Sequence, residues 1–329
     1  MLLSAENDSD TDKYKGNRPV SSSNAKIRHL QLPLPPELIS EIFVHLNYSY
    51  DNISSEGTRL VSQVCSLWRE IVLAEPGCWS SLTMSLSQED AAEEASVLST
   101  WIARSGTRPL SLSLMCHNDM ETHPILPVIL SAAHRWYDVD FFFPAPFFAQ
   151  LSAVRGQLKL LHRLEVGESN ASRHNIDTPI VDFAASAPSL SILELRLSPD
   201  RISVPWSRIS DLSVSWIHTS ELSSVLQKLP NLAILNVQSA YPLPLRHCFY
   251  SRNSPFVLQN LHTLYIATDA VADWLHGLQL PALRHLLIEA KGRTDLISDL
   301  LTELIAQSRF TLDTFEITSK QVRDETLIQ

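Results

Sequence analysis

The chain has 329 residues, 44% of them hydrophobic, which is enough for about two domains with packed cores. Its 36 acidic and 26 basic residues give a net charge of −10, which offers no electrostatic reason to bind nucleic acid or an anionic membrane. Four scattered cysteines do not predict a disulfide framework. No segment has the pattern of a signal peptide or a membrane span, so we expect a cytoplasmic or nuclear protein.

The first 26 residues are rich in Ser, Asp, Asn and Lys, with almost no large apolar side chain after Leu3. Such a segment cannot bury enough surface to offset the entropy lost on ordering. We therefore predict a disordered tail over residues 1–26.

Two short amphipathic helices are predicted next. The pair Pro35-Pro36 suits a helix start, because an initial proline gives up only an N–H that has no partner. Neither helix would be stable alone in water, so they must pack on each other or on a partner. The first helix carries Leu38, Ile39, Ile42, Phe43 and Leu46 at helical spacing, and the second carries Leu60, Val64, Leu67, Trp68 and Ile71.

These residues carry a family resemblance. Leu34-Pro-Pro-Glu-Leu-x-x-Glu-Ile-Phe43, then Val64-Cys-x-x-Trp-Arg-x-Ile71, and then Trp79 resemble an F-box. The stretch Trp101–Leu114 is similar to the segment after the F-box in mushroom-type fungal F-box proteins. The chain departs from the family at Asn47–Gly57, a polar stretch predicted to be a loop, where many F-boxes have a short extra helix.

The resemblance implies docking to the Skp-type adaptor of a cullin–RING ubiquitin ligase through an apolar helical face. The alternative is that these side chains only pack the core of their own domain. Leu34 and Pro35 best separate the two readings, because they precede the helix and add little to a core. The predicted adaptor-binding residues are Leu34, Pro35, Leu38, Ile42, Val64, Trp68 and Ile71.

Strands and helices are predicted to alternate from Trp79 onward. Trp79–Met84 and Pro109–Leu114 alternate apolar and polar residues as strands do, and Asp90–Arg104 has helical periodicity. The phenylalanine-rich run Val139–Leu151 is too short to span a bilayer and is predicted to be buried core.

A repeat of the form apolar-x-x-apolar-x-apolar comes after these elements. Its starts lie 19 to 29 residues apart, within or close to the roughly 20–29 residues of leucine-rich repeats. Helical stripes between several motifs predict one strand and one helix per repeat, stacked so that neighbours cover each other. An ordinary open α/β sheet is the alternative. The motifs start at Trp136, Leu161, Leu190, Ile209, Leu232, Leu261, Leu283 and Leu312.

The predicted fold class is therefore α/β: a helical F-box over residues 27–82, then an irregular leucine-rich-repeat solenoid with a mostly parallel, curved sheet over 83–329. In such strands the residues between the apolar positions point to the concave face, where a target protein would bind. The residues predicted to bind the target are Arg163, Glu165, Glu194, Arg196, Asp211, Asn236, Tyr265, His285 and Glu289. Ser213, Thr263, Thr314 and Glu316 are expected on the same face.

No pattern in the sequence predicts catalysis. There is no glycine-rich phosphate loop and no Gly-x-Ser-x-Gly elbow. Cys116, His117, Asp119 and His123 lie close in sequence, but their spacing matches no ordinary zinc site and favours a polar loop. We predict a chain without catalytic residues, metal or cofactor.

The sequence thus predicts a substrate-receptor subunit of an SCF-type ubiquitin ligase. It would bind the adaptor through the F-box and an unknown target protein through the repeats. One alternative is a leucine-rich scaffold in which the F-box-like helices only cap the solenoid. Another is a small-molecule hydrolase or transferase on an α/β sheet, which would require a deep pocket with converging titratable groups.

Overall fold

The computed structural model describes residues 34–49, 52–169, 180–215, 219–238, 256–268, 278–290 and 297–319. The predicted tail over residues 1–26 lies outside these ranges. From Pro36 onward the described residues belong to one compact unit with two hydrophobic cores, a small one among the first helices and a large one behind a sheet.

The first helical region differs from the prediction in two places. The single helix predicted over Leu60–Ile71 is two helices, because Cys65 has an extended backbone (φ −158°, ψ 170°) that interrupts it. The predicted polar loop is instead a short antiparallel hairpin followed by the start of a helix. The elements are α1 (Pro36–His45), β1 (Tyr48–Ser49), β2 (Asn52–Ile53), α2 (Glu56–Val61), α3 (Ser66–Ala74) and the 3₁₀ turn η1 (Pro76–Trp79).

The buried Asn47 side chain holds this arrangement together. Its Oδ1 accepts a hydrogen bond from the Thr58 N–H at 3.0 Å, and its Nδ2 donates to the Cys78 carbonyl at 3.0 Å. Nδ2 also lies 2.6 Å from the Thr58 hydroxyl, which in turn donates to the same carbonyl. A buried amide that satisfies several partners specifies one local structure. Asn47 thus ties the end of α1 to α2 and to η1.

Two tryptophans join the small core to the sheet. Trp79 of η1 and Trp101 of α4 (Ala91–Arg104) meet edge to face, with ring centroids 4.6 Å apart. The Trp101 Nε1 donates to the Ser81 carbonyl at 2.9 Å, and the Arg104 guanidinium lies 4.4 Å from the Trp79 ring centroid. Strand β3 (Ser81–Leu86) spans the predicted domain boundary at 82–83. The helices and the sheet therefore share a packed joint.

The sheet has ten strands that are all parallel and lie in chain order. Each of the eight repeat motifs contributes one strand, and the two strands predicted upstream also belong to the sheet. The predicted α/β class with a mostly parallel sheet is confirmed, and the sheet is open. Its strands are β3, β4 (Leu110–Cys116), β5 (Trp136–Phe143), β6 (Arg163–Glu168), β7 (Ile192–Arg196), β8 (Asp211–Ser215), β9 (Ile234–Gln238), β11 (Thr263–Thr268), β13 (His285–Ala290) and β14 (Thr314–Ser319).

The register sorts the side chains into rows. Apolar residues directly opposite one another form two continuous rows on one face, because side chains alternate between the two faces along each strand. One row runs from Leu82 to Phe315, and all its members but Phe315 are buried. Its members are Leu82, Leu112, Val139, Leu164, Leu193, Leu212, Leu235, Leu264, Leu286 and Phe315.

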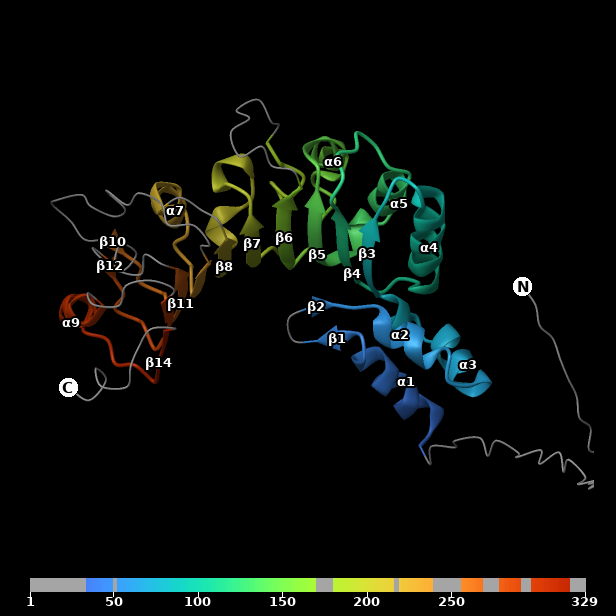
Figure 1. The fold of residues 1–329 in the computed structure, drawn as a ribbon, viewed down its shortest axis with the longest axis horizontal. Coiled ribbons are helices and arrows are strands. Elements are labelled where there is room, and N and C mark those ends of the chain that lie inside the picture. The colour runs from blue at the N-terminus through green and yellow to red at the C-terminus, as the bar shows by residue number, and fades with distance from the viewer. Residues whose placement is uncertain are drawn as a thin grey trace, which may run out of the picture. The chain divides into compact units, whose positions relative to one another are not determined.

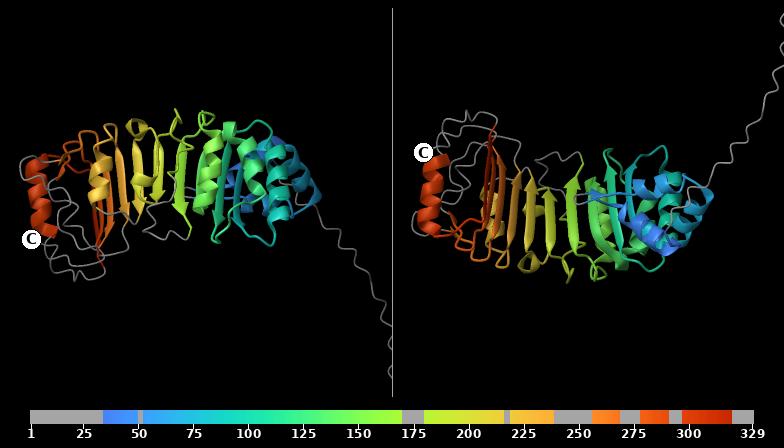
Figure 2. Two further views of the ribbon diagram at one scale, coloured as in Figure 1. Left: turned by 90° about the horizontal axis from the view of Figure 1, so that it is seen from above. Right: turned by 90° about the horizontal axis from the view of Figure 1, so that it is seen from below.

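Helices cover the apolar face of the sheet; the other face is covered at the β3–β4 end, where β2 contacts both strands, and lacks covering helices over the strands that follow (Figures 1 and 2). Figure 1 shows the sheet bending away from these helices, so the bare face is the concave one. Within the described ranges, no helix is both long and apolar enough to cross a bilayer. The covering helices are α4, α5 (Ile125–Ser131), α6 (Ala145–Leu151), α7 (Thr219–Leu226) and α9 (Ile297–Ser308).

The expected regular strand–helix alternation is wrong for part of the sheet. Between β7 and β8 the chain forms two 3₁₀ turns, η4 (Pro199–Arg201) and η5 (Trp206–Arg208), instead of an α-helix. This is the shortest repeat, and Pro199 and Pro205 lack the N–H that a helix interior would need. The short parallel strands β10 (Phe256–Val257) and β12 (Leu278–Gln279) add a second departure.

Aromatic side chains pack together in the large core between β5 and α6. The run Val139–Leu151, predicted to be buried, contributes Phe141 and Phe143 from β5 and Phe147 and Phe148 from α6. Phe141 lies 4.7 Å from Phe143 and 5.3 Å from Trp136, measured between ring centroids. The prediction of a buried core is confirmed for these four residues.

Candidate protein-binding surfaces

Helix α1 has a buried side and an exposed apolar side. Ile39 and Phe43 are almost fully buried in the small core. Leu38 and Ile42, one turn apart along the helix, and Leu46 directly after its end are 52%, 47% and 49% exposed. A helix that only packs against its own domain presents polar residues to water. The exposed leucines and isoleucine are therefore available to another molecule.

The next two helices repeat this pattern. Leu60 in α2, Val64 in the turn after it, and Leu67 in α3 are each at least 42% exposed. Helix α1 packs against both α2 and α3, so the exposed side chains lie on adjoining elements. We call Leu38, Ile42, Leu46, Leu60, Val64 and Leu67 the helical apolar face.

The predicted adaptor-binding residues divide between surface and core. Leu34 and Pro35 are exposed, as are Leu38, Ile42 and Val64. Trp68 and Ile71 are half-buried and pack against the small core, and the Trp68 ring lies 5.0 Å from that of Phe43. Leu46, Leu60 and Leu67 were in the predicted stripes but not among the predicted contacts. The sequence could have indicated these contacts, because the two apolar stripes contain more large side chains than the packing of one core requires.

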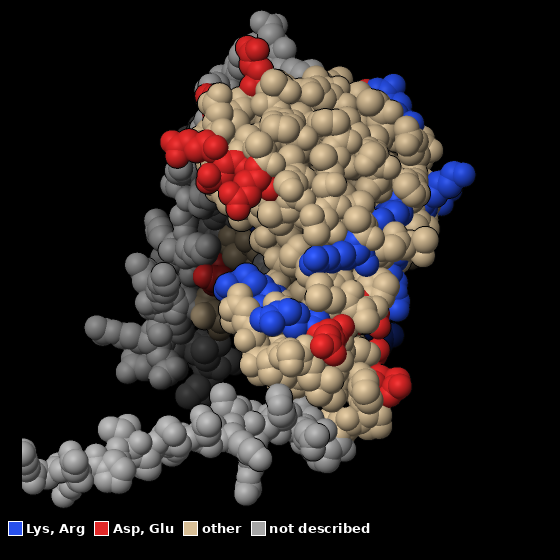
Figure 3. Space-filling view, turned by 90° about the vertical axis from the view of Figure 1, so that its right-hand side faces the viewer, with Lys and Arg blue, Asp and Glu red and all other residues tan. Residues whose placement is uncertain are grey.

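Figure 3 looks at the end of the molecule that carries α1–α4. Charged side chains gather there in separate groups and leave broad uncharged areas between them. Large exposed apolar areas on a soluble protein mark interaction sites more often than chance would place them. The apolar character of this end comes from the exposed aliphatic side chains of α1, α2 and α3.

The concave face of the sheet carries the predicted target-binding residues. The register places all nine on this face, on strands β6 to β13, with Ser213, Thr263, Thr314 and Glu316 beside them. One row across it reads Asp140, Glu165, Glu194, Ser213, Asn236, Tyr265, Leu287, Glu316. The inward–outward alternation predicted for these strands is therefore present. Whether a target binds there stays a prediction.

Arg163 is the centre of a charged cluster in the first half of this face. Its guanidinium lies 3.0 Å from Asp138 Oδ1, 2.9 Å from Glu165 Oε2 and 3.3 Å from Glu194 Oε2. Arg196 pairs with the other oxygen of Glu165. Two guanidinium groups thus hold together carboxylates from three neighbouring strands.

Three carboxyl groups in and beside this cluster, those of Asp138, Glu165 and Asp211, are harder to ionise than usual. Burial, together with the charges of Asp140 and Glu194, raises the pKa of Glu165 to about 7, although both arginines oppose the shift. Burial also raises the pKa of Asp138, and burial with the charge of Glu194 raises that of Asp211. The cluster is therefore close to gaining or losing a proton near neutral pH.

The second half of the concave face has a different character. Asn236, Tyr265 and Leu287 follow one another in one row, and His285 lies between Thr263 and Thr314 in another. The Tyr265 hydroxyl donates to Glu289 Oε2 at 2.9 Å. The described part of this half contains carboxylates, an aromatic ring and an aliphatic side chain.

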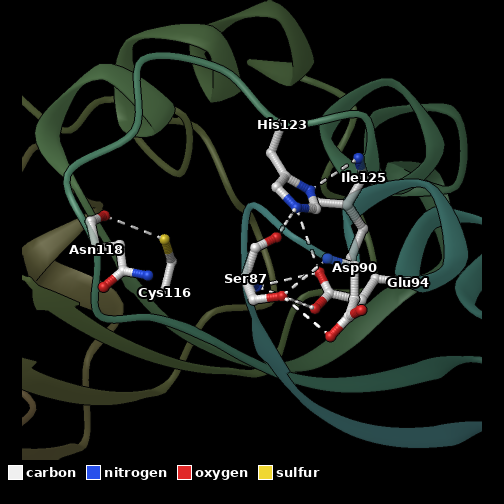
Figure 4. Close-up of polar contacts among 7 residues, drawn as sticks. All are labelled: Ser87, Asp90, Glu94, Cys116, Asn118, His123 and Ile125. Carbon is white, nitrogen blue, oxygen red and sulfur yellow. Dashed lines mark hydrogen bonds and ion pairs between the residues drawn. The ribbon is translucent and has the colours of Figure 1, made fainter.

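The sequence neighbours Cys116 and His123 have structural partners (Figure 4). His123 is 2% exposed, and its Nδ1 accepts a hydrogen bond from the Ile125 N–H at 3.2 Å. Its Nε2 therefore carries the proton and points to the Ser87 carbonyl at 3.1 Å and to Glu94 Oε2 at 3.3 Å. In the described ranges no group of three His, Cys, Asp or Glu side chains could hold a metal ion.

Cys116 also differs from the prediction. It ends strand β4 instead of opening a polar loop, and its thiol donates to the Asn118 carbonyl at 3.3 Å. Burial raises the pKa of the thiol, which keeps it protonated.

His123→Ala is expected to lower the free energy of unfolding by about 2–3 kcal/mol, because it removes a buried ring and with it the contacts of Nε2 to the Ser87 carbonyl and to Glu94, which keeps only its hydrogen bonds from Ser87. Urea denaturation followed by circular dichroism measures the loss. His134→Ala, which changes an exposed histidine, is the control and should change stability by less than about 0.5 kcal/mol. Equal losses in the two variants would contradict a structural role for His123.

In comparisons with known proteins, no protein-family model and no curated protein matches the chain.

Proposed function

We propose that this chain is the substrate-receptor subunit of an SCF-type ubiquitin ligase. The observation that carries the proposal is the helical apolar face, six large aliphatic side chains exposed on adjoining helices. In this role the face binds the Skp-type adaptor, and the concave face of the sheet holds the target. Ubiquitin transfer is assigned to other subunits, and a cytoplasmic or nuclear location belongs with the same proposal.

The local structure around the F-box-like motifs supports this reading. Three short helices pack around a core of Ile39, Phe43, Val61 and Val72. Helix α2 lies between α1 and α3, directly after the β1–β2 hairpin that takes up most of the stretch Asn47–Gly57. A short helix at this place is compatible with the family pattern, which remains a resemblance.

The sheet supports the second half of the proposal. Parallel strands in chain order, with connections on one face, are the arrangement expected of stacked leucine-rich repeats. The spacing of the motifs points the same way. A broad bare face with mixed charge suits a protein partner better than a small ligand, which requires an enclosed pocket.

The contact between Trp79 and Trp101 is also compatible with the scaffold alternative, because a terminal cap packs against the first strand of a solenoid in the same way. A cap, however, serves to present a polar outer surface to water. The helical apolar face has the opposite character, which favours a partner over a cap.

The deciding experiment is co-purification with the Skp-type adaptor. Leu38→Asp/Val64→Asp places two charges in the helical apolar face, where both side chains are exposed and the fold has little to lose. Because each desolvated anchor contributes about 2 kcal/mol or more, we expect affinity to fall at least about 100-fold.

The matched control is Leu160→Asp/Ile180→Asp, which makes the same change at two exposed apolar residues outside the helices. Circular dichroism should show both double variants folded, and only the first should lose the adaptor. Failure of the unaltered chain to bind would contradict the ligase role and favour the scaffold. Equal loss in both variants would show that the helical apolar face is not the contact.

A further inference from the structure

A hollow lies on the concave face near the C-terminal end of the sheet. Strands β11, β13 and β14 line it. Leu287 lies between Tyr265 and Glu316 in one row, and Glu289 is in the next outward row with Thr318. The hollow therefore combines an aromatic ring, an aliphatic side chain, two carboxylates and a hydroxyl.

The two carboxylates of the hollow have no cationic partner among the described residues. The Glu289 contact there is the hydrogen bond from the Tyr265 hydroxyl, and Glu316 is exposed. The cluster around Arg163 differs, because its carboxylates are already paired with two arginines of the same chain. The described residues of the hollow thus supply negative charge and no positive charge.

The apolar part of the hollow restricts what that molecule can be. A simple metal ion gains nothing from the Leu287 side chain or the Tyr265 ring. A lysine or arginine side chain has an aliphatic stem that packs on such groups and a charged head that pairs with carboxylates. Its head can also interact with the ring face of tyrosine.

Tyr265 prepares one of the carboxylates for this role. Burial and the hydrogen bond to Glu289 raise the pKa of Tyr265, so its hydroxyl stays protonated and continues to donate across the neutral range. One oxygen of Glu289 is thereby occupied. No other described residue donates a hydrogen bond to Glu289, so its second oxygen can accept one from a partner.

We propose that this hollow, made by Tyr265, Leu287, Glu289, Glu316 and Thr318, receives a lysine or arginine side chain of the target protein. The inference rests on the proposed function, since it names the chemistry of the target and the place on the concave face where it binds. It identifies the target as a protein that presents a basic residue in an accessible segment.

A displayed library of random twelve-residue peptides is the probe. Selection on the purified full-length chain should enrich peptides that share a lysine or arginine at one position. Glu289→Gln/Glu316→Gln should weaken their binding at least tenfold. Glu89→Gln/Glu93→Gln, which neutralises two exposed carboxylates near the start of α4, is the charge-matched control and should leave binding unchanged.

A second variant tests occupancy directly. Leu287→Arg places in the hollow the group that the target is proposed to supply, so the added guanidinium pairs with the two carboxylates and the enriched peptides should again bind at least tenfold more weakly. Enrichment without a shared basic residue overturns the proposal. So does the absence of any enriched peptide, and so does equal binding to the unaltered chain and to the double variant at Glu289 and Glu316.

This outcome is separable from that of the ligase proposal, because the selection contains no adaptor. Adaptor binding without a basic-residue preference would keep the receptor role and place the target elsewhere on the concave face. Basic-peptide binding without adaptor binding would keep the hollow and remove the ligase role.

Discussion

Arg163→Met is expected to lower the free energy of unfolding by about 3–5 kcal/mol at pH 8, because it leaves buried carboxylates without their central cation. Three carboxyl groups contact this guanidinium, and Glu165 among them is 4% exposed. Methionine keeps most of the side-chain volume, so the loss reports charge more than packing.

The loss should shrink at pH 5. The pKa of Glu165 is raised from its ordinary value of 4.5 to about 7, so between these two pH values the folded state holds a proton that the unfolded state has released. The contribution of Glu165 to stability therefore falls as pH rises through this window and is greatest below it. At pH 5 the Glu165 carboxyl is mostly protonated in the folded state, so it needs the arginine less.

Urea denaturation at the two pH values, with hydrogen exchange of the amides in β5–β7, measures this effect. Arg284→Met is the control, because Arg284 and its partner Asp313 are both largely exposed at 3.5 Å and such pairs contribute about 0–1 kcal/mol. An equal loss for Arg163→Met at pH 5 and pH 8 would show that packing, not the charged cluster, explains its importance.

Phe141→Ala should lower the free energy of unfolding by about 3–5 kcal/mol, the usual cost of emptying a phenylalanine site in a close-packed core. Phe141 is fully buried and contacts the rings of Trp136, Phe143 and Phe183. These neighbours are large and held from several elements, so they cannot easily close the space. Differential scanning calorimetry and urea denaturation would both record the loss.

The adjacent residue provides the matched control. Phe142 is on the same strand but points to the concave face, where it is half-buried. Phe142→Ala removes the same atoms and should cost about 1 kcal/mol or less. A cost for Phe142 equal to that for Phe141 would contradict the alternation of faces on which the assignment of the concave surface depends.

The strands could be predicted because their signal is local. Every apolar-x-x-apolar-x-apolar motif repeats the same inward positions, and burying those positions leaves little freedom in where each strand lies. The apolar side of α1 was visible for the same reason, since Leu38, Ile42 and Leu46 share one spacing.

The features that were missed depend on partners far away in the sequence. The Asn47 side chain resembles that of any loop asparagine until Thr58 and Cys78 are placed beside it. The hollow is a similar case, because its residues come from three strands and meet only when the register is known. The break between α2 and α3 at Cys65 was not predicted either, because the apolar residues keep their helical spacing across it.

The order of the strands has a consequence for how the chain folds. Each inner strand of the ten-stranded sheet pairs with the sheet strands that precede and follow it in the chain, so every step closes only a short loop. We expect folding to nucleate in one stretch, with the aromatic-rich β5 and α6 as the favoured place, and to spread to both sides. Unfolding should follow the same geometry. A weakened strand in the middle, such as β6, would divide the sheet into two blocks that melt separately.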